Sequence, residues 1–128
     1  MVRAAMKAMD NAYAPYSGHS VGACVLAADG TLYTGVNIEN AIGRLSVAAA
    51  EVAMYRAVAD GKREFDGVLV ISDFERPFVP NGAVLQLLAE FEVPEVVMAN
   101  MEGKIEQAEL KTLLPYAREP IENAAHRD

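Results

Sequence analysis

The sequence has one cysteine, Cys24, among its 128 residues. A single thiol excludes a disulfide within the chain and any metal site built from several cysteines of one chain. The chain also lacks an apolar run long enough to cross a bilayer. Its first residues carry scattered charges and no apolar stretch of the secretory type. We therefore expect a cytoplasmic protein that does not associate with a membrane.

Basic residues are the second scarce class, with 11 Lys and Arg against 18 Asp and Glu, for a net charge of −7. A protein that binds a nucleic-acid backbone needs a basic face, so no nucleic-acid partner is expected. Hydrophobic residues make up 52% of the chain, which is typical of a globular protein. The length fits one domain, expected over residues 1–117 and followed by a flexible C-terminal tail over 118–128.

The spacing of apolar residues predicts alternating helices and strands. Asp29-Gly30 indicates a hairpin, and the continuous apolar run over 67–72 is typical of a buried strand. Ser46 suits the N-cap of the second helix, and Gly61 lies just beyond its last turn. The expected helices are 2–14, 46–60, 81–91 and 108–114, and the expected strands are 21–27, 31–36, 67–72 and 95–100.

This order predicts an α/β fold in which helices pack on the faces of one mixed sheet. The two central helices would begin at Ser46 and Asn81 and point their N-termini toward one edge of the sheet. Helix N-termini favour anions and thiolates because they present unpaired N–H groups. A pocket is therefore expected at that edge.

Four short segments carry motifs whose order and spacing point to a known family. They are residues 12–17 with 21–23, 34–41, 80–91 and 113–117. Together they resemble the small cytidine deaminases, over about residues 2–117. The resemblance implies a three-layer α/β/α sandwich of the cytidine deaminase type, with a mixed sheet and helices on both faces. It also implies a homotetramer in which neighbouring chains complete each pocket.

That family holds a zinc ion with three cysteines, and a glutamate moves protons between the zinc-bound water and the base. Aligned on the Asn-x-Glu-Asn-Ala run, the cysteine positions hold Ala48, Asn81 and Val84, and the glutamate position holds Ala50. Catalytic zinc needs about three ligands with lone pairs. Without the metal, the pKa of water stays at its high bulk value, so hydroxide is scarce at neutral pH. We therefore expect no metal, no cofactor and no deamination of cytidine.

Three ionisable residues are candidates for other chemistry. Glu51 replaces an arginine that many family members carry. It is one position from Ala50, and one step along a helix turns a side chain by about 100°. We therefore do not expect Glu51 to take the place of the family's acid/base glutamate. His19 falls where the family usually has a phenylalanine at the pocket entrance. It can stack on a base, act as an acid or base, or simply lie on the surface. Asp73 either lines the pocket or faces water.

Asn37 and Glu39 occupy the positions that hold the ribose hydroxyls in the family. An amide and a carboxylate suit a diol, although Asn37 can also simply end a strand and Glu39 face solvent. Our leading hypothesis is a zinc-free pseudoenzyme that binds a nucleoside or related small molecule through this site. The alternatives are an enzyme with metal-free chemistry in the same pocket, such as nucleoside hydrolysis, and a non-catalytic structural subunit.

Overall fold

The computed structural model describes residues 1–120. Most of the expected tail lies in residues 121–128, outside the described part of the chain. Within residues 1–120, no helix is both long and apolar enough to cross a membrane.

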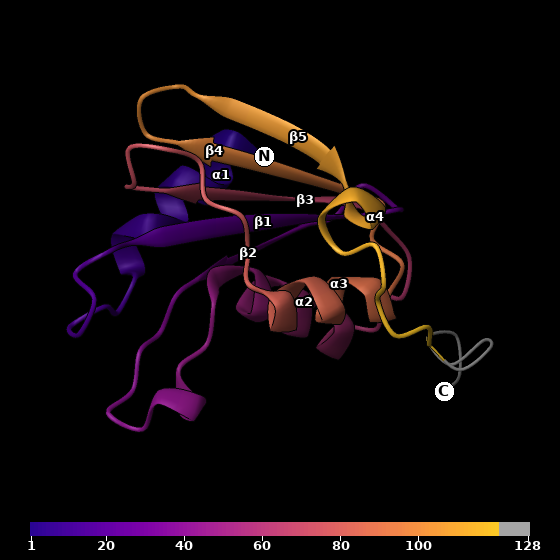
Figure 1. Ribbon diagram of the computed structural model, residues 1–128, viewed down its shortest axis with the longest axis horizontal. Coiled ribbons are helices and arrows are strands. Elements are labelled where there is room, and N and C mark those ends of the chain that lie inside the picture. Colours follow the sequence, from indigo (N-terminus) through magenta and orange to yellow (C-terminus); the bar gives the residue numbers. More distant parts are fainter. Residues whose placement is uncertain (121–128) are drawn as a thin grey trace.

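A five-stranded sheet in the order β2-β1-β3-β4-β5 forms the centre of the molecule (Figure 1). All neighbouring strands are antiparallel except β3 and β4, which are parallel and are connected by helix α3. A parallel pair needs such a crossover because the chain has to return to the starting edge. The strands are β1 (Val21–Ala27), β2 (Leu32–Val36), β3 (Phe65–Ser72), β4 (Glu95–Asn100) and β5 (Ile105–Glu109).

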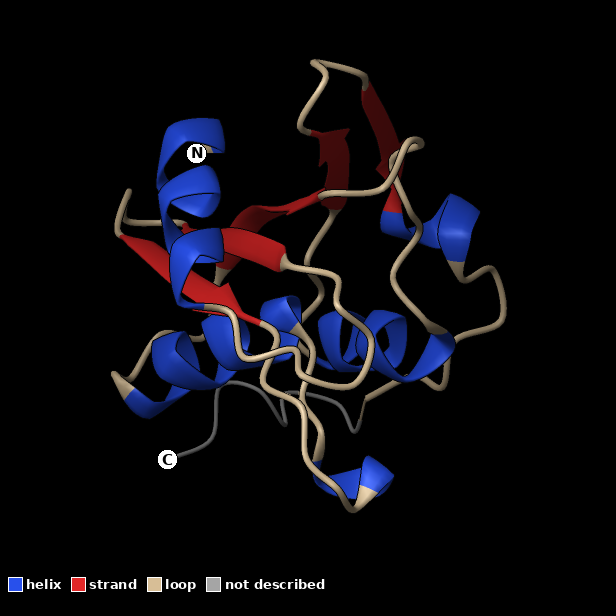
Figure 2. Ribbon diagram, turned by 90° about the vertical axis from the view of Figure 1, so that its left-hand side faces the viewer, coloured by secondary structure: helices blue, strands red, loops and turns tan. Residues whose placement is uncertain are grey.

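Helices cover both faces of the sheet (Figures 1 and 2). Helix α1 (Val2–Ala8), continued by a short 3-10 turn over Met9–Asn11, packs against one face. Helices α2 (Ala49–Ala59) and α3 (Gly82–Glu90) pack against the other, and α4 (Leu110–Leu113) closes one end. The α/β/α sandwich expected from the resemblance is thus confirmed.

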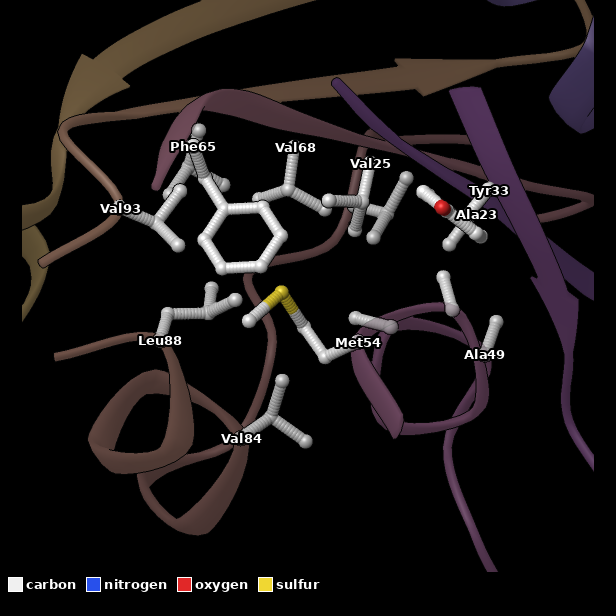
Figure 3. Close-up of a cluster of buried hydrophobic side chains, with 14 of the residues drawn as sticks. Ala23, Val25, Tyr33, Ala49, Met54, Phe65, Val68, Val84, Leu88 and Val93 are labelled. Carbon is white, nitrogen blue, oxygen red and sulfur yellow. The ribbon is translucent and has the colours of Figure 1, made fainter. Parts of the chain in front are cut away.

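The main core lies between the sheet and helices α2 and α3. Figure 3 shows Met54 of α2 and Leu88 of α3 facing Phe65 and Val68 of β3. Successive side chains of a strand point to opposite faces. Accordingly Leu69 and Ile71 belong to the smaller core beneath α1. This continuous burial on both faces is why β3 reads as an uninterrupted apolar run.

Strand β5 is the element that sequence analysis missed. Residues 101–107 are all exposed, so their pattern carries no buried face. The strand forms because a turn at Gly103, with φ of 87°, lets the chain fold back and pair with β4. The predicted helix over 108–114 is therefore wrong at its start, where Ala108 pairs with Val96, and the helix is limited to α4.

Two helix boundaries also differ from the prediction, since long-range backbone bonds decide them. The first helix ends at Asn11 rather than 14, because Tyr13 is extended and pairs with Ile38. The second begins at Ala49, because Val47 exchanges two backbone hydrogen bonds with Ile38. Ser46 is not the N-cap of α2; its Oγ accepts a hydrogen bond of 2.9 Å from the Asn40 N–H.

Helix α2 lies against strand β2 at Gly35. A Cβ atom at this glycine would lie 2.3 Å from the carbonyl oxygen of Ala49 and 2.5 Å from the backbone nitrogen of Ala53. Arg56 adds a second link, donating from Nη1 to the carbonyl oxygen of Thr34 at 2.7 Å. Only glycine allows the helix this close to the strand, and this contact fixes where the N-terminus of α2 lies.

Gly35→Ala should therefore destabilise the protein. The added methyl group meets backbone atoms, which cannot rotate away, and overpacking of this kind costs about 1–3 kcal/mol. Gly43→Ala is the matched control, because a Cβ there meets nothing within 4 Å. Urea unfolding followed by circular dichroism measures both. Equal stability of the two variants would contradict the close approach of β2 and α2.

Candidate functional site

A pocket of about 240 Å³ lies at one edge of the sheet, beside the first turns of α2 and α3. Ala48, Ala49 and Ala50 reach it from the start of α2, and Asn81 and Val84 from the start of α3. Two helix N-termini therefore meet at one pocket, as the sequence predicts. The remaining lining residues are Ser17, His19, Val21, Asn37, Val70, Phe74, Phe78 and Pro80.

The two helix starts differ in how their backbone N–H groups are satisfied. At α3, the side chain of Asn81 accepts a hydrogen bond of 2.9 Å from the Val84 N–H. At α2 the N-cap residue is Ala48, which has no side-chain acceptor. The first N–H groups of a helix have no acceptor within the helix. Those of Ala49 and Ala50 therefore give the pocket a positive partial charge.

Glu51 completes the start of α2 and does not line the pocket. Its Oε1 accepts a hydrogen bond of 2.9 Å from the Ala48 N–H, which is the backward half of a capping box. The Tyr55 hydroxyl lies 3.5 Å from Oε2 of the same carboxylate. The structure thus gives this glutamate a capping role and does not bring it together with the other candidates.

The four positions aligned with the zinc ligands and the acid/base glutamate all line this one pocket. Ala48, Ala50 and Val84 offer only hydrocarbon there, and Oδ1 of Asn81 is already bonded to the Val84 N–H. Zinc sites in proteins use thiolate, imidazole or carboxylate ligands. Across residues 1–120, no three His, Cys, Asp or Glu side chains form a group that could hold a metal ion.

The side chains of this pocket therefore do not fit a zinc ion. The single cysteine does not change this. Cys24 is buried in β1 within the smaller core, on the face of the sheet that α1 covers. Burial raises the pKa of its thiol, which disfavours the thiolate that a metal would need.

His19, which lines the pocket, is hydrogen-bonded to Asp73 from a distant segment of the chain. Nδ1 of His19 lies 3.0 Å from Oδ1 of Asp73, and Oδ2 of Asp73 accepts a 3.0 Å hydrogen bond from the Ser20 N–H. The rings of His19 and Phe74 are stacked with centroids 4.3 Å apart. The pairing of Val21 with Ser72 across β1 and β3 brings these segments together.

Asn37 and Glu39 hold the backbone around the pocket. Asn37 lines the pocket. Its Oδ1 accepts a hydrogen bond of 2.9 Å from the Val21 N–H, and its Nδ2 donates one of 2.8 Å to the His19 carbonyl oxygen. Glu39 accepts hydrogen bonds from the backbone N–H groups of Tyr16 and Ser17 and from the Ser17 hydroxyl. The bond from that hydroxyl is the main cause that lowers the pKa of Glu39. Their role in sugar binding stays a prediction.

Phe74 and Phe78 are pocket residues that sequence analysis did not single out. Both line the pocket, and their ring centroids are 5.5 Å apart. Their positions carried a usable signal, because both lie in the segment that follows the buried strand over 67–72. Chain segments that leave a sheet at its edge commonly line binding sites in α/β folds.

Comparison with known proteins gives the same family over most of the chain. The family model for the cytidine and deoxycytidylate deaminase zinc-binding region matches residues 1–72. A protein named cytidine deaminase from Sporosarcina psychrophila is 39% identical, over 99% of this chain and 96% of its own. Another from Halalkalibacterium halodurans is 36% identical, over 91% of this chain and 90% of its own.

A solved structure agrees with this fold. The crystal structure of cytidine deaminase from Burkholderia pseudomallei superposes with a TM-score of 0.88 and 38% identity. The match covers 91% of this chain and 95% of that protein. Sequence and structure comparisons therefore point to the same family.

These likenesses contradict the function predicted from the sequence. Relatives named cytidine deaminase extend over nearly the whole chain, and the matched region is the zinc-binding one. The prediction of a zinc-free nucleoside-binding protein that does not deaminate cytidine is wrong, and so are its two alternatives, a metal-free enzyme and a structural subunit. That Ala48, Ala50, Asn81 and Val84 replace ligand and acid/base residues stays a prediction. The chain belongs to the cytidine deaminase family.

Proposed function

We propose that this protein deaminates cytidine or a closely related aminopyrimidine nucleoside, with water replacing the amino group of the base. The observation that supports this most is the pocket at the starts of α2 and α3, within a chain similar throughout to cytidine deaminases. Its walls include aromatic and aliphatic side chains, which suit a flat base.

The chain's own groups would stabilise the reaction by charge and position. Attack of water on the base places negative charge on the ring. The N–H groups of Ala49 and Ala50 at the start of α2 are suitable donors for it, because preorganised dipoles act most strongly where water is excluded. The apolar side chains of Val70, Phe74 and Phe78 would keep bulk solvent out of the pocket.

The sugar would lie at the polar side of the pocket, near Asn37. Its amide keeps one N–H after donating to the His19 carbonyl oxygen, and that N–H suits a ribose hydroxyl. Glu39 would contribute by holding residues 16 and 17 in place and by offering remaining carboxylate lone pairs.

A homotetramer in the cytoplasm completes the proposal. The loop that carries Gly43–Leu45 stands away from the body of the chain (Figure 2). Ile42 and Leu45 on this loop are about half exposed, at 54% and 49%. Apolar side chains on a projecting loop suit burial against a second copy, which would also supply walls to an open pocket.

Ala48→Leu should abolish turnover by filling the pocket. Ala48 lines it in an extended conformation that accepts any side chain, so the helix itself should persist. We expect the wild-type protein to convert cytidine to uridine with release of ammonia. The variant should bind cytidine at least about tenfold more weakly, which corresponds to about 1.4 kcal/mol of binding free energy. Calorimetry and product analysis measure the two effects.

Ala59→Leu is the matched control, since Ala59 is exposed at the far end of the same helix. It should leave binding and turnover unchanged. Wild-type protein that neither binds nor converts cytidine or deoxycytidine would refute the proposed function.

Zinc ligands restored at the aligned positions should bind the metal. The variant Ala48→Cys, Ala50→Glu, Asn81→Cys and Val84→Cys places three thiols and a carboxylate around one pocket, next to helix N-termini that stabilise thiolates. Glu51 is retained because it caps α2. We expect about one zinc per chain by elemental analysis. The double variant Asn81→Cys with Val84→Cys should bind far less zinc. Equal zinc content in the two variants would show that position 48 does not converge with positions 81 and 84 on one metal site.

Ile42→Asp with Leu45→Asp should dissociate the assembly. A buried unpaired carboxylate costs several kcal/mol, so the projecting loop could no longer pack against a second copy. Light scattering after size exclusion should give a tetramer for the wild type and smaller species for the double variant. Ile42→Val with Leu45→Met keeps the loop apolar and should remain tetrameric. A monomeric wild type would rule out the proposed assembly.

A further inference from the structure

Asn100 is a buried polar residue at the end of β4, at 2% exposure. A buried amide needs hydrogen-bond partners inside the protein, because leaving it unpaired is costly. Oδ1 of Asn100 accepts hydrogen bonds of 3.0 Å from the Glu102 N–H and 2.9 Å from the Lys104 N–H. Nδ2 donates one of 2.6 Å to the carbonyl oxygen of Glu75. Two donors on one side and a carbonyl oxygen on the other allow a single orientation of the amide.

These three bonds reach two different parts of the chain. Glu102 and Lys104 belong to the turn between β4 and β5, whereas Glu75 belongs to the segment that follows β3. The parallel pairing of β3 with β4 sets Ser72 opposite Asn100, so the two strands end side by side. Figure 1 shows the chain that leaves β3 turning at this side of the sheet before it descends to α3. The amide of Asn100 therefore ties that segment to the end of β4.

The segment over residues 74–80 forms the aromatic wall of the pocket. Phe74, Phe78 and Pro80 line the pocket, and the ring centroids of the two phenylalanines are 5.5 Å apart. The segment is neither helix nor strand, so it has no regular backbone bonds of its own. Within residues 1–120, the bond from Asn100 to Glu75 is the one hydrogen bond that joins residues 74–80 to the rest of the protein.

We propose that Asn100 is a positioning residue of the pocket, which holds the wall formed by Phe74 and Phe78 in place for the flat base of a nucleoside. The inference rests on the proposed function, since it takes a nucleoside as the ligand. Asn100 acts through the backbone of Glu75 and touches no reacting atom. When that bond is lost, the wall is in place in a smaller fraction of the molecules, and the apparent affinity falls by that fraction.

Asn100→Asp separates the two tasks of the amide. A carboxylate still accepts from the Glu102 and Lys104 N–H groups, but at about pH 8 it is ionised and has no proton to donate to the Glu75 carbonyl oxygen. The turn is kept and the bond to the wall is lost. Ser72→Ala is the matched control, because it removes a buried hydroxyl at the paired position that has no hydrogen-bond partner within residues 1–120.

Fluorine-19 NMR of protein labelled with 4-fluorophenylalanine observes the wall without any substrate. The chain has four phenylalanines, which should give four signals. Phe65 and Phe91 pack against each other in the main core, with centroids 6.1 Å apart, and report on the fold. In Asn100→Asp we expect the Phe74 and Phe78 signals to shift or broaden while the other two stay. A general loss of structure would move all four.

Kinetics should show a change in binding rather than in chemistry. In Asn100→Asp we expect KM for cytidine to rise by about tenfold, the scale of one buried hydrogen bond. The value of kcat should change by less than about threefold, because the wall contacts the base equally in the ground and transition states. Ser72→Ala should keep both constants and all four fluorine signals. Asn100→Ala adds no charge, should move the same two signals, and serves as a second variant if the aspartate prevents folding.

The outcomes distinguish this inference from the proposed function. Unmoved Phe74 and Phe78 signals in both Asn100 variants would overturn the inference while wild-type turnover stands, and so would moved signals with unchanged KM. Equal effects of Asn100→Asp and Ser72→Ala would also overturn it. A wild type that neither binds nor converts cytidine would overturn the proposed function and the inference with it. Local signal changes together with a raised KM support both.

Discussion

The antiparallel pairing of β1 with β3 is the constraint on which the rest of the site depends. Its register sets Val21 opposite Ser72, so the segments that leave the two strands run side by side at the pocket. The same strand pairs Gly22 with Val36 of β2, which places Asn37 beside Val21. A slip of one residue would turn every side chain of β1 to the other face and separate His19 from Asp73.

Helices α2 and α3 add the second half of the site by a different physical means. Their first turns need acceptors, and each end meets this need in its own way, through the Glu51 carboxylate or the Asn81 amide. The result is a pocket whose polarity comes from backbone N–H groups and from the β1–β3 edge rather than from the helix side chains.

The family assignment and the pocket chemistry rest on different parts of the chain. Identity of 39% to a cytidine deaminase extends over nearly all residues, whereas the zinc chemistry depends on a few side chains. Predicting function from those positions alone failed against the full-length comparisons. His19, one of the candidates from the sequence, lines the pocket from the segment before β1.

Sequence alone determined the α/β class, the strands at 21–27 and 95–100, and the edge at which two helices begin, because periodicity and turn residues are local signals. It also placed Ala48, Ala50, Asn81 and Val84 at one site. Tertiary structure alone decided the exposed edge strand β5, the start of α2 at Ala49 and the bonds of Glu39 to Tyr16 and Ser17. It likewise decided the contact of His19 with Asp73. Each of these depends on hydrogen bonds between residues far apart in the chain, and no local pattern of side chains records which distant partner a polar group will meet.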